Sequence, residues 1–293
     1  LKINSKNKKS MLKALSPKRM INSEQHASVK KNKYEYMKTV LRLTLSISLL
    51  LTMAIAQSQS KMVSIKGGSY IPLYGRDSLK VTIDDFQMDV YPVTNKEFLE
   101  FVKKKPKWQR SIIKKLFADD NYLASWDSDT ILGKNKALKA PITNVSWFVA
   151  NDYCECQGKR LPTIDEWEYV AMSNESMADA RTLETYNKYI LSWYEKPKTF
   201  NNEIGSTFKN YWGVYDLHGL VWEWTIDFNS VLVSGESRKD VDNDSNLFCG
   251  SAAIGATDLM NYAAFMRYAI RGSVKAKYAL KNLGFRCVKD IKD

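Results

Sequence analysis

The sequence predicts a compact α+β domain in which much of the backbone is irregular. Helix signals are few and clustered, and the two clearest are capping boxes, Thr94 with Glu97 and Thr163 with Glu166. Strand signals are short and end at Gly or Asp residues. Long segments rich in turn residues, Trp and Tyr lie between them, so we expect aromatic packing to hold the domain together.

Two strands are expected near the start of the domain. Residues 62–70 begin with Met-Val-Ser-Ile and run into a turn at Gly67-Gly68. Residues 81–91 alternate apolar and polar side chains, with a bulge-like break at Asp84-Asp85. The second run is therefore predicted to be one strand with an irregularity.

Helices are expected after each capping box. The box at Thr94 opens a helix whose Phe98, Phe101 and Val102 follow the i, i+3, i+4 spacing of a buried face. A short helix is expected over residues 112–117, because Pro106 breaks the chain before it. Ser146 is a plausible N-cap for a helix from Trp147 to about Cys156.

The remaining helix and turn signals follow along the chain from Gly158 to Glu223. Gly158 ends the preceding helix, where a residue with positive φ costs little. The helix capped by Thr163 comes next, and residues 174–209 are polar and predicted to be irregular. Residues 210–224 hold two Gly and four aromatic rings before Glu223, which predicts a tight turn packed by aromatic side chains.

The formal net charge of +12 is concentrated in the first residues of the 293-residue chain. Residues 1–56 hold 12 of the 44 Lys and Arg and 2 of the 32 Asp and Glu, so residues 57–293 carry 32 positive and 30 negative side chains. A net charge of +2 does not support a nucleic-acid-binding surface. We therefore expect no nucleic-acid partner.

The leader has the features of a secretory signal peptide at residues 37–56. Lys38 and Arg42 supply its positive end, residues 43–53 its apolar run, and residues 54–56 an A-x-A cleavage site. The run is shorter than the roughly 20 apolar residues of a membrane span, although an uncleaved anchor is the alternative. Residues 1–36 are interpreted as an upstream extension or a misassigned start, and residues 57–293 as one domain.

The four cysteines are Cys154, Cys156, Cys249 and Cys287. Export would make disulfides possible. Cys154 and Cys156 form a C-x-C pair rather than C-x-x-C, so neither a thioredoxin motif nor a zinc ribbon is indicated.

Five motifs in order resemble the formylglycine-generating enzyme, or sulfatase-modifying factor, family over almost all of residues 61–289. Their central element is the run of residues 158–169, Gly-Lys-Arg-Leu-Pro-Thr followed by Glu-Trp-Glu-Tyr. The others are Met-Val-x-Ile-x-Gly-Gly at 62–68, Met-Asp-Val-Tyr-Pro-Val-Thr-Asn at 88–95, Tyr-Asp-Leu-x-Gly-x-Val-Trp-Glu-Trp at 215–224 and Gly-Phe-Arg-Cys at 284–287. Asn-Val-Ser-Trp at 144–147 precedes the central run in the expected order.

The resemblance implies a variant of the C-type-lectin-like α+β fold. It also implies a disulfide between Cys154 and Cys287, the alternative being two buried thiols. The family binds structural calcium near the motif that contains Glu223, but Leu220 stands where the family has Asn. Because calcium takes about 6–8 oxygen ligands, this loss weakens the site, and Glu223 is otherwise a buried, hydrogen-bonded carboxylate.

The family's enzymes oxidise a sulfatase cysteine to formylglycine with molecular oxygen, and the copper-dependent type holds Cu(I) with two cysteines. The positions that match this pair hold Ala263 and Tyr268, and no Cys occurs between residues 250 and 286. Because soft thiolates select Cu(I), copper is not expected. An iron site like that of the related sulfoxide synthases needs several His, and the chain has only His26 and His218. His218 is better explained as a packing residue in its turn.

Ser251, Arg267 and Arg271 lie in segments that, by the resemblance, line the substrate groove. These side chains would bind peptide carbonyls or an anion, or else the arginines form structural ion pairs. The first hypothesis for function is an exported, non-catalytic binding or accessory module for another exported protein or peptide, in a bacterial periplasm. The alternative is a formylglycine-type oxidase of a protein cysteine or small thiol that works by an altered mechanism. No stable membrane span is expected after signal cleavage.

Overall fold

The computed structural model describes residues 34–44, 61–73, 79–229 and 259–291. By internal contacts the chain divides into two units, Leu1–Gln59 and Ser60–Asp293. In the first unit, residues 34–44 form a helix with exposed side chains, and the expected cleavage site at 54–56 lies outside the described residues. Among the described helices, none has the length and apolar character needed to cross a bilayer.

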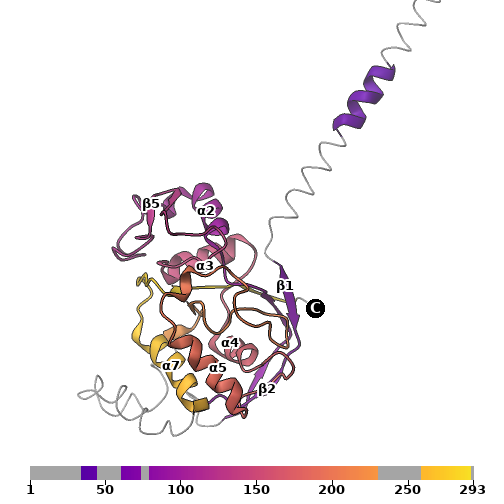
Figure 1. The fold of residues 1–293 in the computed structure, drawn as a ribbon. Coiled ribbons are helices and arrows are strands. Elements are labelled where there is room, and N and C mark those ends of the chain that lie inside the picture. Colours follow the sequence, from indigo (N-terminus) through magenta and orange to yellow (C-terminus); the bar gives the residue numbers. More distant parts are fainter. Residues whose placement is uncertain (1–33, 45–60, 74–78, 230–258, 292–293) are drawn as a thin grey trace, which may run out of the picture. The chain divides into compact units, whose positions relative to one another are not determined.

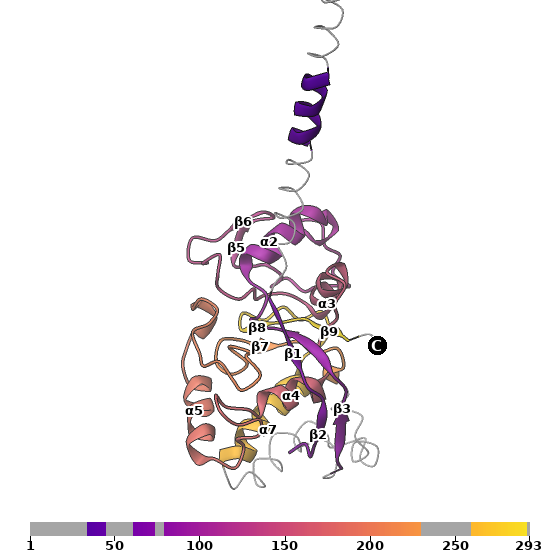
Figure 2. The ribbon, with the colours of Figure 1, turned by 90° about the vertical axis from the view of Figure 1, so that its right-hand side faces the viewer.

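The second unit is built around a small antiparallel sheet that joins its first and last segments (Figures 1 and 2). Its strands are β1 (Met62–Ile65), β4 (Phe86–Asp89) and β9 (Val288–Asp290), in the order β1-β4-β9. Met62 pairs with Asp89, and Phe86 at the other end of β4 pairs with Asp290. The middle strand is therefore covered on both edges, and only short outer edges are left unpaired.

The prediction of one strand with an irregularity at Asp84-Asp85 is confirmed for residues 81–89. This run forms β3 (Val81–Ile83), which pairs with β2 (Gly68–Tyr70), and then β4, which pairs with β1. The antiparallel register is the same on both sides of the interruption, from Met62 opposite Asp89 to Tyr70 opposite Val81. The Asp85 carboxylate accepts hydrogen bonds from the Gly67 amide at 2.9 Å and from Lys66 Nζ at 2.8 Å. A Cβ at Gly67 would lie 2.2 Å from the Ile83 carbonyl oxygen, so the close approach of the two segments at the interruption requires glycine here.

At one end of the domain, α2 (Asn95–Lys104) and α3 (Trp147–Cys156) pack beside β5 (Trp126–Ser128) and β6 (Ile131–Leu132) (Figure 2). The capping box at Thr94 is confirmed, and the three predicted apolar residues of α2 are buried. Ser146 stands at the N-cap of α3 as predicted, but its side chain makes no capping bond.

The short helix predicted over residues 112–117 is wrong. The chain forms a 3-10 turn, η1 (Pro106–Trp108), and then two separate turns closed by the carbonyls of Gln109 and Lys114. Between them, the Ser111 amide and hydroxyl both donate to the Asp129 carboxylate, at 2.8 and 2.5 Å. This local side-chain bonding competes with a continuous helix.

The other end of the domain carries three helices, α4 (Ile164–Ala171), α5 (Glu184–Tyr194) and α7 (Leu259–Ser273) (Figure 1). The capping box of α4 at Thr163 and Glu166 is confirmed, and Gly158 has φ +66°. The prediction that residues 174–209 are irregular is wrong for α5, which packs against α7. A second 3-10 turn, η2 (Thr199–Asn201), follows α5.

Between the two ends, β7 (Trp222–Glu223) and β8 (Leu283–Gly284) form a short parallel pair. The tight turn predicted before Glu223 is confirmed, since Gly213, Asp216 and Gly219 all have positive φ. A Cβ at Gly219 would lie 2.7 Å from the Trp193 ring, so this residue brings the turn against α5.

Aromatic packing is a main feature of the larger core, as the composition predicts. The ring of Phe98 lies 6.0 Å from Tyr153, 6.2 Å from Phe285 and 6.3 Å from Trp126, measured between centroids. These four side chains come from α2, α3, β5 and the C-terminal segment. Together with the short strands, this arrangement confirms the α+β class with much irregular backbone.

The expected disulfide between Cys154 and Cys287 is confirmed. It joins α3 to the segment before β9, with Cα atoms 5.6 Å apart and both residues fully buried. Cys156, two residues further along α3, is an exposed free thiol. Cys249 lies outside the described residues.

Replacing both bridged cysteines, Cys154→Ser with Cys287→Ser, should lower the free energy of unfolding by about 2–5 kcal/mol, because the bond closes a long loop. Urea denaturation of the full chain measures this loss. Cys156→Ser is the matched control and should leave the midpoint unchanged. A bridge-free variant as stable as the wild type would contradict the prediction.

Candidate functional site

The first feature of the candidate site is a buried ion pair between Glu223 and Arg286. Arg286 donates to both Glu223 oxygens, with contacts of 2.8 Å to each, and both side chains are fully buried. Trp167 Nε1 also donates to Glu223 Oε2 at 2.8 Å. The rest of the guanidinium bonds the carbonyl oxygens of Asp89, Val90 and Tyr215.

These contacts bear on the weakened calcium site that the resemblance implies near Glu223. Both carboxylate oxygens already accept bonds from Arg286, and a cationic guanidinium occupies the space beside them. Over the described ranges, no group of three or more His, Cys, Asp or Glu is placed to hold a metal ion. The residues around Glu223 therefore do not fit a calcium site, because calcium needs several anionic or carbonyl oxygens.

The second feature is a cluster of two arginines on one carboxylate. Arg267 and Arg271 are one turn apart on α7, and both contact Glu168 of α4. Arg267 donates to both Glu168 oxygens, at 2.9 and 2.7 Å, and Arg271 donates to Oε1 at 2.6 Å. The sequence left ligand binding and structural ion pairs open for these arginines, and the ion pairs are formed.

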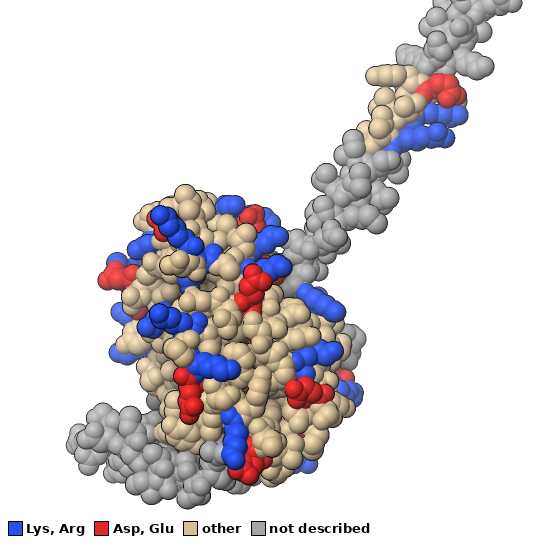
Figure 3. Space-filling model, in the orientation of Figure 1, with Lys and Arg blue, Asp and Glu red and all other residues tan. Residues whose placement is uncertain are grey.

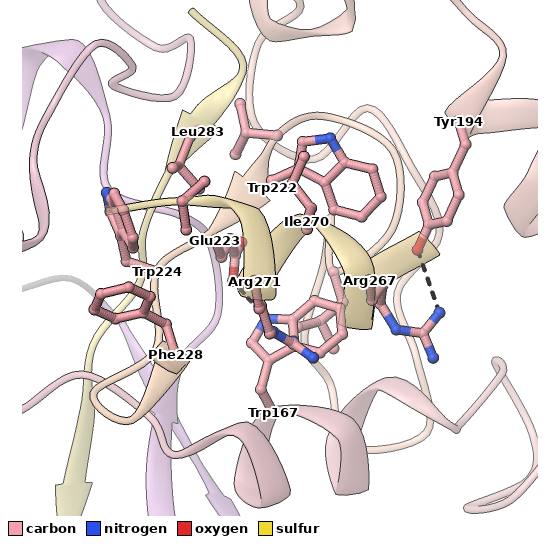
Figure 4. A pocket seen from close by; sticks show the side chains of 13 residues that line it. Trp167, Tyr194, Trp222, Glu223, Trp224, Phe228, Arg267, Ile270, Arg271 and Leu283 are labelled. Atoms are coloured by element: carbon pink, nitrogen blue, oxygen red, sulfur yellow. Dashed lines mark hydrogen bonds between the residues drawn. The ribbon is translucent and has the colours of Figure 1, made fainter. Parts of the chain in front are cut away.

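Electrostatics in this cluster favour the charged form of Glu168. Burial alone would raise the pKa of its carboxyl, but the charges of Arg267 and Arg271 and their hydrogen bonds lower the pKa to about 2. The Arg271 guanidinium also lies 5.0 Å from the centroid of the Trp167 ring, in cation–π contact (Figure 4). The cluster as a whole keeps one excess positive charge.

The cavities beside these arginines are small. One, of about 20 Å³, lies between Trp167, Trp222 and Arg271 (Figure 4). The other, of about 40 Å³, is lined by Tyr70, Asp165 and Tyr268 among others. Each has room for one or a few waters rather than for a peptide side chain.

The two positions that the resemblance assigns to copper ligands lie on α7. Ala263 is buried against a cluster that includes Tyr186 and Ile190 of α5, and Tyr268 lines the second small cavity. A methyl group and a phenol do not fit a Cu(I) site that needs thiolates. Ser251, the third groove residue predicted from the resemblance, lies outside the described residues.

His218 is buried within a hydrogen-bond network at the end of α4. Its Nε2 lies 2.9 Å from the Ala171 carbonyl oxygen and its Nδ1 lies 3.1 Å from the Tyr194 hydroxyl. Nε2 therefore carries the hydrogen, and Nδ1 accepts from Tyr194. Burial first, and the Arg267 charge second, lower the pKa of His218 to about 3.

A roomier groove of about 380 Å³ opens beside α5. Trp193, Phe200 and Trp222 line it with aromatic rings, and the exposed side chains of Lys196, Lys198 and Lys281 surround them. Among the described residues that line this groove there is no Asp or Glu. We call it the aromatic–lysine groove.

Two details show how the chain builds this groove. Lys198 adopts a left-handed conformation, φ +57°, that starts η2, and Thr199 Oγ1 then donates to the Leu220 carbonyl at 2.9 Å. Lys196 Nζ lies 3.8 Å from the centroid of the Trp193 ring. Sequence reasoning missed this groove, although the aromatic pair Trp193-Tyr194 followed by Lys-Pro-Lys at 196–198 was a local signal for it.

Replacing Glu168 by Gln should lower the free energy of unfolding by about 3–5 kcal/mol, because two buried guanidinium charges lose their counter-ion. Urea denaturation of the full chain measures the change. The control is Glu184→Gln, which breaks only an exposed pair with Lys188 and should cost less than about 0.5 kcal/mol. Equal effects of the two substitutions would refute the buried cluster.

The low pKa of His218 predicts acid destabilisation. The unfolded imidazole binds a proton below pH 6.5 while the folded one stays neutral, so stability is complete above that pH and falls as the pH drops toward 3. The slope should approach about 1.4 kcal/mol per pH unit as the pH falls from 6.5 to 5.5, a window above pH 4.5, near which the Glu168 carboxyl of the unfolded chain takes up its proton.

The test is urea denaturation of His218→Gln at several pH values in that window, where the slope should be lost. The chain has one other histidine, His26, so His26→Gln is the matched control and should keep the slope. If the His218→Gln chain retains the wild-type pH dependence, the neutral buried imidazole is disproved.

Comparison with known proteins identifies the family that shares this architecture. The family model for the sulfatase-modifying factor enzyme 1-like domain matches residues 50–291. The inactive Cα-formylglycine-generating enzyme 2 of Bos taurus is 29% identical over 249 residues, which cover 71% of this chain and 78% of that protein. The formylglycine-generating enzyme of Mus musculus is 26% identical over 258 residues, covering 72% and 68%.

Among solved structures, PvdO from Pseudomonas aeruginosa matches with a TM-score of 0.46 and 17% identity, over 80% of this chain and 95% of that one. The sequence relatives thus include both an enzyme and a protein described as inactive. Because the family model spans most of its length, the chain belongs to the sulfatase-modifying factor family.

Proposed function

We propose that the chain is a non-catalytic member of its family that binds a segment of another exported protein. The observation that carries this proposal is the missing thiolate pair. Residues 250–286 contain no Cys, and the matching positions hold Ala263 and Tyr268. Without two soft ligands in one place, Cu(I) has no site of the kind that the copper-dependent oxidation needs.

The aromatic–lysine groove supports binding as the retained activity. Its volume suits part of an extended peptide, and flat aromatic side chains bury apolar area at little cost in side-chain entropy. Its three lysines and the lack of lining carboxylates among the described residues favour a segment that carries Asp or Glu. The occupant of the groove is therefore an acidic stretch of a partner protein.

Export of the chain is supported by two features. The leader carries a positive end, an apolar run and an A-x-A site, and the domain contains the Cys154–Cys287 disulfide. Disulfides persist in oxidising compartments such as the bacterial periplasm, which is where we place the protein. A partner in the same compartment would meet the groove after its own export.

One experiment tests both halves of the proposal. The full chain is mixed with oxygen, Cu(I) and a fluorescent peptide that carries one Cys among several Asp residues. Fluorescence anisotropy should report binding, and mass spectrometry should find the peptide unchanged. Replacing Lys196, Lys198 and Lys281 together by Gln should weaken binding at least about 10-fold, because the rim charges steer and hold the peptide.

The matched control replaces three exposed lysines on other segments, Lys209, Lys275 and Lys289, by Gln, and binding should then be unchanged. Equal loss in both triple variants would mean that the peptide binds by general charge and not in the groove. A peptide that loses the mass of H₂S and gains oxygen would overturn the non-catalytic assignment in favour of the oxidase alternative.

A further inference from the structure

A second surface, far along the chain from the groove residues, has an unusual composition. Residues 103–117, which we call the basic turn segment, contain seven Lys and Arg and no Asp or Glu in 15 residues. The domain from residue 57 carries 32 positive and 30 negative side chains, so without this segment it has 25 and 30, a net charge of −5. The segment thus carries a local excess of positive charge within a near-neutral domain, and three of its lysines, Lys103, Lys107 and Lys115, are paired with carboxylates of neighbouring segments.

The basic turn segment is held in a fixed conformation. Trp108 is buried, and the Tyr122 hydroxyl donates to its carbonyl at 2.8 Å. The Phe117 ring packs edge-on against Trp108 at 5.6 Å and against Phe148 at 5.5 Å, while Ser111 is bonded to Asp129. The buried Trp108 and the half-buried Phe117 therefore anchor the segment and fix which of its side chains face outward.

The side chains that face outward are cationic and aliphatic. Ile112 is 56% exposed and Leu116 is 72% exposed, one on each of the two turns. Lys104, Lys105 and Lys114 are also exposed, and within the described residues none of them is in a salt bridge. Figure 3 shows Lys and Arg side chains, with some Asp and Glu among them, over the end of the domain that carries α2 and β5.

We propose that the basic turn segment docks the protein peripherally on an anionic phospholipid surface. Lysines near such a surface each raise partition about five-fold through the surface potential. Exposed aliphatic side chains enter the interface between headgroups and acyl chains, where they bury apolar area without crossing the bilayer. An acidic protein would satisfy the lysines but would leave Ile112 and Leu116 without a matching apolar layer, so the observations favour lipid.

Hydrogen exchange with mass spectrometry tests this on the full chain, because the basic leader can bind vesicles by itself and a local readout is needed. Peptides that cover residues 103–117 should exchange more slowly with phosphatidylglycerol vesicles and at the same rate with phosphatidylcholine vesicles. Unchanged exchange in these peptides while the leader is protected would overturn the proposal. Protection by soluble polyglutamate but not by vesicles would also overturn it, in favour of an acidic protein partner.

Two variants separate the charge and apolar contributions. Replacing Lys104, Lys105 and Lys114 by Gln should lower partition into phosphatidylglycerol vesicles about 100-fold. Ile112→Ser with Leu116→Ser should abolish the local protection while leaving the charge unchanged. The matched control is Ile71→Ser with Leu79→Ser, two aliphatics that are 49% and 67% exposed elsewhere. Equal effects of the aliphatic pair and its control would contradict a specific docking surface.

Discussion

The ion pair between Arg286 and Glu223 is the contact on which the rest of the domain depends. The Arg286 guanidinium reaches the Glu223 carboxylate of β7, the carbonyl at the end of β4 and the carbonyl of Tyr215, so one side chain connects three segments with little regular structure. Both partners are fully buried, and removing one would leave an uncompensated charge in the core. The next residue, Cys287, adds a covalent link to α3. The C-terminal segment thus fixes the middle of the domain through polar and covalent contacts.

Consecutive residues of α4 connect this pair to the second charged cluster. Trp167 donates to Glu223, and Glu168 receives both α7 arginines. Because neighbouring helix residues point about 100° apart, α4 can face β7 and α7 at once. Helix α7 is therefore held by ion pairs close to Ala263 and Tyr268, the two positions that the resemblance assigns to copper ligands. Since Arg267 and Arg271 are both paired with Glu168, the proposed function places binding in the aromatic–lysine groove instead.

Local chemistry decided which elements could be predicted from the sequence. The capping boxes at Thr94 and Thr163 and the positive φ of Gly158 depend on side chains within a few residues of one another, so they were read correctly. Helix α5 was missed because it owes its buried face to α7, over 60 residues away. The break at Asp84-Asp85 was also read correctly, and the contact that holds it, from the Gly67 amide to the Asp85 carboxylate, comes from the paired segment 18 residues away.

The candidate site was predictable only in part, for the same reason. The family motifs identified Glu223, Arg267 and Arg271 as residues of interest, yet their roles follow from partners on other elements, Arg286 and Glu168. The aromatic–lysine groove combines side chains from near residues 193–200, 219–222 and 281–282, which no local pattern brings together. The net charge of the domain reveals the basic leader but not the basic turn segment, because acidic residues elsewhere in the domain balance it.

The central claim is that this domain keeps the family's architecture without a thiolate copper site. Copper X-ray absorption spectroscopy on the Cys156→Ser chain, loaded anaerobically with Cu(I), tests it most directly, since that change removes the exposed thiol. The account predicts no stoichiometric copper with two sulfur ligands. One Cu(I) per chain bound by two thiolates would contradict it.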